Sequence, residues 1–193
     1  MTPTLSILIC SLNKRAGMLA SLLEKLSKQI EACEAWDKVE VLVEMDNGEN
    51  PTGTKRNTLL NSAKGVYVVY ADDDDEVFDC YVEEILKAAE QDCDAMAVCG
   101  IMSTNGRDIK KWFIAKDNQY IASRDENGSE IYLRYQNHIS PVKREIALQV
   151  GFTDKYVGED YDYANKLHKM GLVKTEAKIE KPIYHYKFVS NKV

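Results

Sequence analysis

The sequence lacks the features that mark several large classes of protein. No apolar run approaches the roughly 20 residues that a membrane-spanning helix needs. The first basic residues follow the initial apolar stretch instead of preceding it, which is the wrong order for a signal peptide. The five cysteines are odd in number and have no metal-type spacing, so we expect reduced thiols in a cytoplasmic protein. Repeats, low-complexity segments and linkers are also missing, which favours a single domain over residues 1–193.

The overall charge excludes a further class. The formal net charge of -6 argues against broad, non-specific binding to nucleic acid. The 193 residues, 45% apolar and 29% charged, are typical of an ordinary globular domain with a substantial core.

Strand and helix patterns alternate over the first half of the chain. Short apolar runs predict strands over 5–10, 39–45, 66–71 and 94–100. Between them, apolar periodicity predicts helices over 18–33, 53–65 and 79–91, the second ending at Gly65 and the third with Asp79 as its N-cap. This alternation predicts a parallel sheet with helices on both faces.

The pattern changes from about residue 107. Alternating polar and apolar residues around Asn and Gly turns predict antiparallel strands or hairpins up to about 135, with one turn at 127–129. A short helix closed near Gly151 follows, then an amphipathic helix over 159–171 and a final pair of strands over 173–179 and 183–189. The fold class is therefore α/β, with a mostly parallel central sheet and an antiparallel C-terminal part.

Four consecutive aspartates, Asp72 to Asp75, follow the apolar run at 66–71 without a glycine or proline between them. In parallel sheets ligands collect at the carboxyl ends of strands, where these acids lie. A solvated acidic turn is one interpretation. Crowded carboxylates are costly without a neutralising cation, and hard divalent ions prefer oxygen ligands together with phosphate oxygens. We therefore favour a site for Mg²⁺ or Mn²⁺ and a diphosphate.

A nucleotide-binding P-loop is a second interpretation of an acidic strand end. The stretch "GENPTGTK" lies between a strand and a helix, as a P-loop does. In a P-loop, however, lysine directly follows the second glycine and is itself followed by Ser or Thr. Here Thr54 separates Gly53 from Lys55, and the next residue is Arg56. The sequence therefore argues against a P-loop.

Several stretches taken together resemble the GT-A-fold glycosyltransferases of family 2. "SILICSLNKRAGMLASLLEKL" is similar to the family's first strand, turn and helix, and "VEVLVEMDNG" to its second strand. "GTKRNTLLNSAKGVYVVYADDDD" resembles the segment in which an Arg-Asn pair precedes the Asp-x-Asp strand, and "GFTDKYVGEDYDYANKLHKMG" resembles the segment that supplies the catalytic base. The match covers most of residues 5–171 in the family's order.

The resemblance implies roles for particular residues. The donor-binding residues would be Ser11, Asn13, Asp46, Arg56, Asp72 and Asp73. The metal ligands would be Asp74, Asp72 and His185. Asp160 would be the general base, with Glu159 as its positioning partner.

Some of these residues could instead have ordinary structural roles. Asp46 could cap the turn before Gly48, Arg56 could be a surface helix residue, and the acids at 159 and 160 could be first-turn helix acids. His138 could face the acceptor pocket.

The resemblance also implies an activity. A single GT-A domain would use residues 1–100 to bind a nucleotide-sugar, UDP-sugar by family habit, and residues 101–193 to bind the acceptor. Transfer would be metal-dependent and inverting, in the cytoplasm of a bacterium or of a virus-infected host cell. The acceptor could be a glycan, a protein, a small molecule or a modified nucleic-acid base.

Two alternatives remain at this point. A sugar-phosphate nucleotidyltransferase also uses an acidic metal site on an α/β sheet, but it should carry a glycine cluster after the first strand, where this chain has "CSLNKRAG". A non-enzymatic acidic metal-binding module would need neither a nucleotide nor Asp160.

Overall fold

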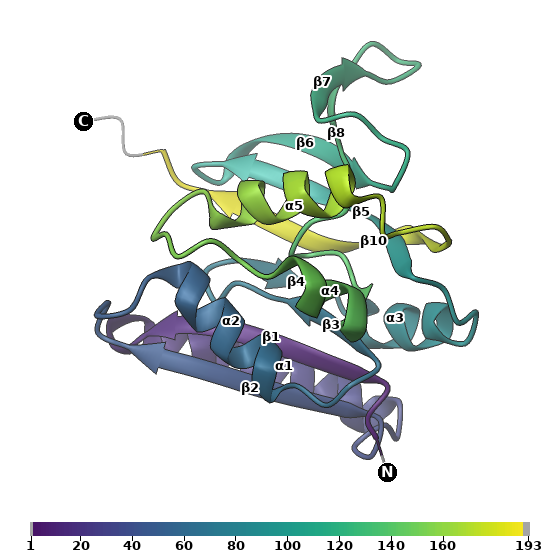
Figure 1. Ribbon diagram of the computed structural model, residues 1–193. Helices are drawn as coiled ribbons and strands as arrows, with labels where there is room; N and C mark the ends of the chain where they lie inside the picture. Colours follow the sequence, from purple (N-terminus) through teal and green to yellow (C-terminus); the bar gives the residue numbers. More distant parts are fainter. Residues whose placement is uncertain (1, 191–193) are drawn as a thin grey trace.

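A ten-stranded sheet runs through the protein (Figure 1). The computed structural model describes residues 2–190. The strand order is β2-β1-β3-β9-β5-β6-β8-β7, and β10 pairs with both β5 and β4. The strands are β1 (Leu5–Leu12), β2 (Val39–Asp46), β3 (Tyr67–Tyr70), β4 (Glu76–Val77), β5 (Ala95–Thr104), β6 (Arg107–Ile114), β7 (Ile121–Arg124), β8 (Glu130–Arg134), β9 (Val142–Lys143) and β10 (Glu176–Phe188).

The parallel part of the sheet is built around β1. This strand pairs in parallel with β2 on one side and β3 on the other. Successive side chains alternate between the two faces of a strand. Ile7 and Ile9 therefore enter one hydrophobic cluster, while Leu8 and Cys10 enter another. Burial on both faces explains why β1 reads as a continuous apolar run, and the parallel arrangement is confirmed.

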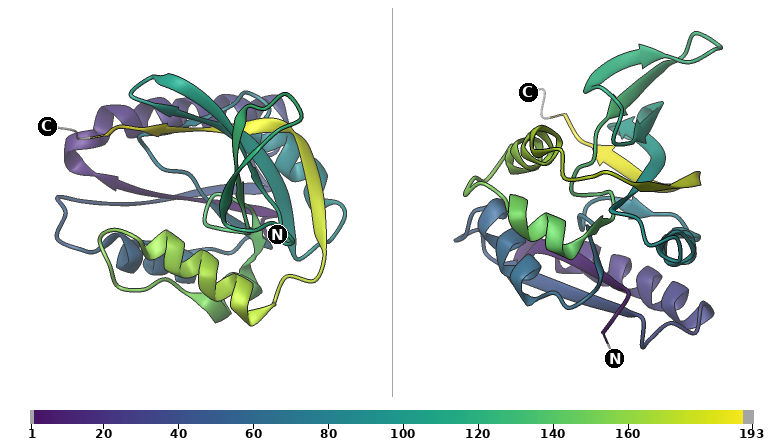
Figure 2. Two further views of the ribbon diagram at one scale, coloured as in Figure 1. Left: turned by 90° about the horizontal axis from the view of Figure 1, so that it is seen from above. Right: turned by 45° about the vertical axis from the view of Figure 1, so that its right-hand side comes forward.

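Five helices cover the two faces of the sheet, also as predicted. They are α1 (Ala16–Ala32), α2 (Thr52–Ser62), α3 (Tyr81–Ala89), α4 (Arg144–Val150) and α5 (Glu159–Met170). α1 and α3 pack together on one face, and α2, α4 and α5 lie on the other (Figure 2, right). None of the helices within residues 2–190 is long and apolar enough to cross a membrane.

The second half of the chain is mixed. β5 and β6 are antiparallel, and β7 and β8 form the predicted hairpin around Gly128, which projects at the top of Figure 1. β8 then pairs in parallel with β6, an arrangement that the sequence did not reveal.

The predicted pair of C-terminal strands is wrong, because both runs belong to the single strand β10. Its pairing with β5 shifts register on either side of Pro182. Proline cannot donate to a ladder, so it occupies the irregularity while the strand continues past it.

Two predicted helix ends also need correction. α2 ends at Ser62 and not at Gly65, because Ala63 already has extended backbone angles. Gly65 instead donates its N–H to Ser6 Oγ at 2.8 Å beside β1. The N-cap of α3 is Cys80, which makes no side-chain capping bond, whereas Asp79 pairs with Lys25 at 3.2 Å. The competing cation holds the carboxylate away from the helix end.

The loop 151–158 before α5 is docked on the start of α2. Gly53 donates its N–H to Lys155 O at 3.0 Å, and Thr52 Oγ1 donates to Tyr156 O at 3.1 Å. Asn57 makes two bonds to the backbone of Phe152, donating to its carbonyl at 2.9 Å and accepting from its N–H at 2.8 Å. These contacts fix the loop that leads into α5.

The substitution Gly53→Ala should loosen this docking. A Cβ at position 53 would lie 1.8 Å from Thr153 O, so helix or loop must move. We expect a loss of about 1–3 kcal/mol in the free energy of unfolding, measured by urea denaturation. Gly17→Ala in α1 is the matched control, because nothing lies within 4 Å of its Cβ, and helix propensity should make it neutral or stabilising. Equal losses in the two variants would contradict this interpretation.

Candidate active site

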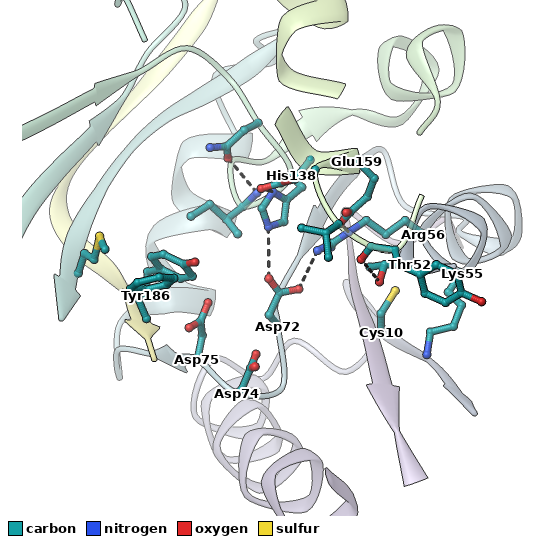
Figure 3. A pocket seen from close by; sticks show the side chains of 18 of the residues that line it. Cys10, Thr52, Lys55, Arg56, Asp72, Asp74, Asp75, His138, Glu159 and Tyr186 are labelled. Carbon is teal, nitrogen blue, oxygen red and sulfur yellow. Dashed lines mark hydrogen bonds and ion pairs between the residues drawn. The ribbon is translucent and has the colours of Figure 1, made fainter. Parts of the chain in front are cut away.

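A cavity of about 870 Å³ opens at the carboxyl ends of β1 and β3 and extends toward β5, β6, β8 and β10. Polar residues from both halves of the chain line it (Figure 3). They include Arg15, Lys55, Arg56, Asp72, Asp74, Asp75, Arg134, Asn137, His138, Glu159 and Asp160. Arg15, Asp72 and Glu159 all line this one concave site, although Arg15 and Glu159 are 144 positions apart in the chain.

The central ion pairs of the site involve Arg56. Its guanidinium donates from Nε to Glu159 Oε1 at 3.1 Å and from Nη2 to Asp72 Oδ1 at 3.0 Å. The side chain is 4% exposed, and its guanidinium carbon lies 5.0 Å from the centroid of the Tyr70 ring and 5.8 Å from that of Phe152. Arg56 is therefore a buried bridge and not a free surface residue of α2.

Asp72 is held in its ionised form. Burial would raise the pKa of this carboxyl, but Arg56 and His138 beside it hold the pKa well below its usual range. His138 Nε2 lies 3.3 Å from Asp72 Oδ2. The other ring nitrogen, Nδ1, lies 3.9 Å from Asp160 Oδ2. His138 thus stands between the acid at the end of β3 and the acid at the start of α5.

The next two aspartates share Arg15. Asp73 is buried; it accepts a hydrogen bond from Ser11 Oγ at 2.6 Å and pairs with Arg15 at 3.0 Å. Burial raises the pKa of Asp73 despite these partners. Asp74 also pairs with Arg15, at 2.7 Å, but its side chain is 50% exposed and lines the cavity. Of this pair, only Asp74 faces the space where a ligand could lie.

Asp75 is the fourth acid and has an unusual environment. Tyr184 in β10 donates its hydroxyl to Asp75 Oδ2 at 2.9 Å, and Lys187 donates its backbone N–H to Oδ1 at 2.7 Å. The Tyr184 hydroxyl also accepts the backbone N–H of Asp72 at 3.0 Å. Burial and the neighbouring Asp72 charge raise the pKa of Asp75 to about 7. The cluster therefore does not carry four full charges at neutral pH.

At the end of β2, Asp46 is engaged with its own turn and with Lys55. It accepts N–H bonds from Gly48 and Asn50, both at 3.0 Å, so the capping role is present. Lys55 Nζ lies 2.8 Å from Asp46 Oδ1 and 2.5 Å from Ser11 O. The Lys55 bond, followed by these backbone bonds, lowers the pKa of Asp46 to about 2 despite partial burial.

Several predicted site residues lie outside the cavity lining. Asn13 hydrogen-bonds to Asn47 at 2.7 Å, and His185 hydrogen-bonds to Ser103 Oγ at 2.9 Å. Ser11, Asp46 and Asp73 also lie outside the lining, but they contact residues that line it. Ser11 and Asp46 accept bonds from Lys55, and Asp73 pairs with Arg15. Within residues 2–190, no group of three or more His, Cys, Asp or Glu side chains is arranged to hold a metal ion.

Sequence reasoning missed three contributors. Arg15 follows the first strand in "LNKRAG", and a cation there could have been expected to face the acids at the end of β3. The sequence suggests Lys55 only as a misplaced P-loop lysine, and its partner Asp46 is not evident from the local pattern. The role of Tyr184 could not be predicted from the sequence, because 109 positions of chain separate it from its partner Asp75.

The family follows from a sequence match over the part of the chain that carries the Asp cluster. The sequence model described as "Glycosyl transferase family 2" matches residues 45–151. This match covers more than half of the chain. The chain belongs to glycosyl transferase family 2. The predicted family is confirmed.

Solved structures show the same GT-A fold in this family 2 chain. TarS 1-349 from S. aureus in complex with UDP-GlcNAc superimposes with a TM-score of 0.66 at 15% identity, covering 98% of this chain and 60% of that one. The same piece in complex with UDP gives a TM-score of 0.62 at 16% identity, covering 95% and 60%. The longer TarS structure gives 0.60 at 12% identity, covering 95% and 36%.

The family 2 chain thus spans about 60% of the length of the TarS 1-349 structures that it resembles. At these identities the likeness shows the fold alone. Among curated proteins, none matches the sequence.

Replacing Arg56 with Met should be strongly destabilising. The substitution leaves Asp72 and Glu159 without their shared cation, and breaking a buried pair typically costs about 3–5 kcal/mol. Lys143→Met is the control, because Lys143 pairs at 2.9 Å with Asp92, whose side chain is 85% exposed; such surface pairs contribute about 0–1 kcal/mol. Denaturant unfolding of both variants checks this, and similar losses would argue against a central role for Arg56.

Asp75 should give the protein a distinctive pH dependence. Its pKa is raised from 3.8 to about 7 on folding, so the folded state binds more protons than the unfolded state between these values. The free energy of unfolding should therefore fall as pH rises through this window. Asp75→Asn should remove most of that fall, up to about 4 kcal/mol for a pKa that rises from 3.8 to about 7.

The measurement is denaturant unfolding from pH 4 to pH 8 in EDTA. Asp37→Asn is the control, because Asp37 is exposed and forms no ion pair among the described residues. A slope that Asp75→Asn leaves unchanged would refute the assignment.

Proposed function

We propose that this chain transfers a sugar from a nucleoside-diphosphate sugar, with UDP favoured, to an acceptor hydroxyl. The observation that supports this most is the shared cavity, which brings the acids at the end of β3 into one space with Asp160 at the start of α5. A donor beside Asp72 and Asp74 would leave its anomeric carbon between those acids and Asp160. The reaction needs this arrangement, with leaving-group stabilisation on one side and a base on the other.

The diphosphate would interact with Arg15 and Arg56. Arg15 Nε and Arg56 Nη1 are buried and have no hydrogen-bond partner among the described residues. Both side chains line the cavity. Unused donors on two arginines suit an anionic ligand, because guanidinium groups bind phosphate with charge-assisted bonds. Solved TarS complexes contain UDP-GlcNAc and UDP, which supports a uridine donor here. Ser11, Asn13, Asp46 and Asp73 would shape the donor site.

The residues present fit a divalent metal held in the way that Mg²⁺ usually is. Mg²⁺ and Mn²⁺ take one or two protein carboxylates together with substrate phosphates and water. Asp74 offers a half-exposed carboxylate in the cavity, with one oxygen paired to Arg15 and the other unpaired. Asp72 has both oxygens engaged, so Asp74 is the first ligand in this proposal. Such a metal would neutralise charge on the departing diphosphate.

His185 as a further metal ligand stays a prediction, because the structure turns it toward Ser103.

Asp160 would act as the general base. Its side chain is 43% exposed in the cavity, whereas the neighbouring Glu159 is buried against Arg56. Asp160 is therefore the acid that an acceptor hydroxyl can reach, and Glu159 holds the start of α5 in place. Removal of the hydroxyl proton as the oxygen attacks the anomeric carbon would give a single displacement with inversion. The cytoplasm is the expected location.

Calorimetry with UDP, GDP, CDP and dTDP, with and without Mn²⁺ or Mg²⁺, tests the donor site. We expect metal-dependent binding of UDP that Asp74→Asn weakens about 10-fold or more, since a bond to a charged group contributes about 1.5–3 kcal/mol. Asp37→Asn should bind like the wild type. Absence of binding by the folded protein to all four nucleotides, with metal present, would overturn the proposal.

Asp160→Asn separates chemistry from binding. The variant should bind UDP normally but lose about 10²–10⁴-fold in transfer rate, the usual contribution of a general base. Transfer is measured with radiolabelled UDP-sugars against a panel of glycans, proteins, small alcohols and hydroxymethylated DNA. Unchanged transfer by this variant would assign the base elsewhere.

A further inference from the structure

The part of the cavity that the second half of the chain lines is more apolar, beginning at Tyr186 beside Asp75 (Figure 3). Strands β5, β6, β8 and β10 and the segment before β7 form its wall. The residues are apolar or aromatic, with one exception: Met102, Trp112, Ile114, Tyr120, Tyr132, Arg134, Tyr186 and Phe188. Three of the aromatic side chains are well exposed, Tyr120 at 39%, Tyr186 at 39% and Phe188 at 40%. This aromatic wall can hold a ring by stacking.

Arg134, the exception, is fixed in a defined position. Its guanidinium carbon lies 4.1 Å from the centroid of the Tyr120 ring and 5.0 Å from that of Tyr132. Nη1 donates to Ile121 O at 2.9 Å and to Leu133 O at 2.7 Å. These contacts hold Arg134 at the base of the β7–β8 hairpin, and both of these bonds use Nη1, not Nε or Nη2.

The charge of Arg134 is also uncompensated. No carboxylate within the described part of the chain lies within 4.0 Å of its guanidinium. The other cations of the cavity all have acidic partners: Arg15 pairs with Asp73 and Asp74, Lys55 with Asp46, and Arg56 with Asp72 and Glu159. A half-buried guanidinium without a counter-charge is well suited to bind an anion.

Arg134 is linked to the start of α5 through the Tyr120 ring, on which its guanidinium lies. The Tyr120 ring packs edge-on against Tyr161 with centroids 5.2 Å apart, and Tyr161 directly follows Asp160 in α5. An acceptor on the aromatic wall could therefore offer a hydroxyl to Asp160 while another of its groups reaches Arg134.

We propose that Arg134 is a specificity-determining residue that selects acceptors with an anionic group, phosphate or carboxylate, attached next to a ring. The ring stacks on the aromatic wall, and the anion accepts bonds from Nε and Nη2 of Arg134. A planar guanidinium suits this task, since two parallel N–H groups match two oxygens of a phosphate or carboxylate. The inference rests on the proposed function, because it assigns this part of the cavity to the acceptor.

Three small probes test the inference without knowledge of the natural acceptor. Phenyl phosphate and phenyl β-glucuronide carry an anion beside a ring, while phenyl β-glucopyranoside is neutral. Each is titrated by calorimetry into protein saturated with UDP and Mg²⁺, so that the diphosphate position is already filled. We expect the two anionic probes to bind about 10-fold or more tightly than the neutral one. The stronger of the two identifies the anion as phosphate or carboxylate.

Arg134→Gln should reduce the anionic probes to the affinity of the neutral probe and leave UDP binding unchanged. The matched control is Arg124→Gln in the same hairpin. Arg124 is exposed, donates to Gly128 O at 2.6 Å and does not line the cavity. Because Arg134 also anchors the hairpin, the Nε–Hε NMR signal of Arg134 in the wild-type protein provides a second measurement. It should shift with the anionic probes only.

Equal affinity for charged and neutral probes, an unshifted Nε–Hε signal, or equal effects of the two substitutions would overturn the inference. Displacement of UDP by phenyl phosphate would also overturn it, because the anion would then occupy the donor position. Failure of the proposed function gives a different result, since UDP itself would not bind.

Discussion

The ion pairs of Arg56 with Asp72 and Glu159 are the constraint on which the site depends. A guanidinium that is only 4% exposed is tolerated because it makes charge-assisted bonds to two carboxylates and stacks on two aromatic rings. These bonds join three elements: the α2 helix, the end of β3 and the start of α5. Together with the docked loop 151–158, they set the position of Asp160 relative to the four aspartates, although 88 positions of chain separate Asp72 from Asp160.

Each of the four aspartates has different partners and a different environment. Asp72 is paired with Arg56 and His138, Asp73 with Ser11 and Arg15, and Asp74 with Arg15 at the edge of the cavity. Asp75 is held by Tyr184 and a backbone N–H, and its pKa lies near 7. Repulsion within the cluster is therefore relieved by nearby cations and by retention of a proton, which leaves Asp74 as the exposed carboxylate.

The two halves of the chain contribute different strands and side chains to the same cavity. Parallel strands β1 and β3 bring charged side chains to one wall, as their shared direction requires. The mixed strands of the second half bring aromatic rings and Arg134 to the facing wall, which begins at Tyr186 beside Asp75 (Figure 3). Strand β10 connects the halves: it pairs with β4 and β5, and its Tyr184 hydroxyl bonds to both Asp72 and Asp75.

The sequence alone determined the α/β class, the parallel arrangement of the first strands, the family and the location of the acids at a strand end. These follow from local information, since apolar periodicity and the order of short motifs need no distant partner. Even so, local signals misjudged the end of α2, the N-cap of α3 and the continuity of β10 through Pro182.

Only the tertiary structure decided which partner each acid has. Arg15, Lys55, His138 and Tyr184 reach the site from different elements, and their contacts depend on how strands and helices pack. The lack of a counter-charge for Arg134 is likewise a property of packing. A sequence fixes which charges a chain carries, but the energy of a charge depends on burial and on neighbours within a few ångströms, which only the folded chain brings together.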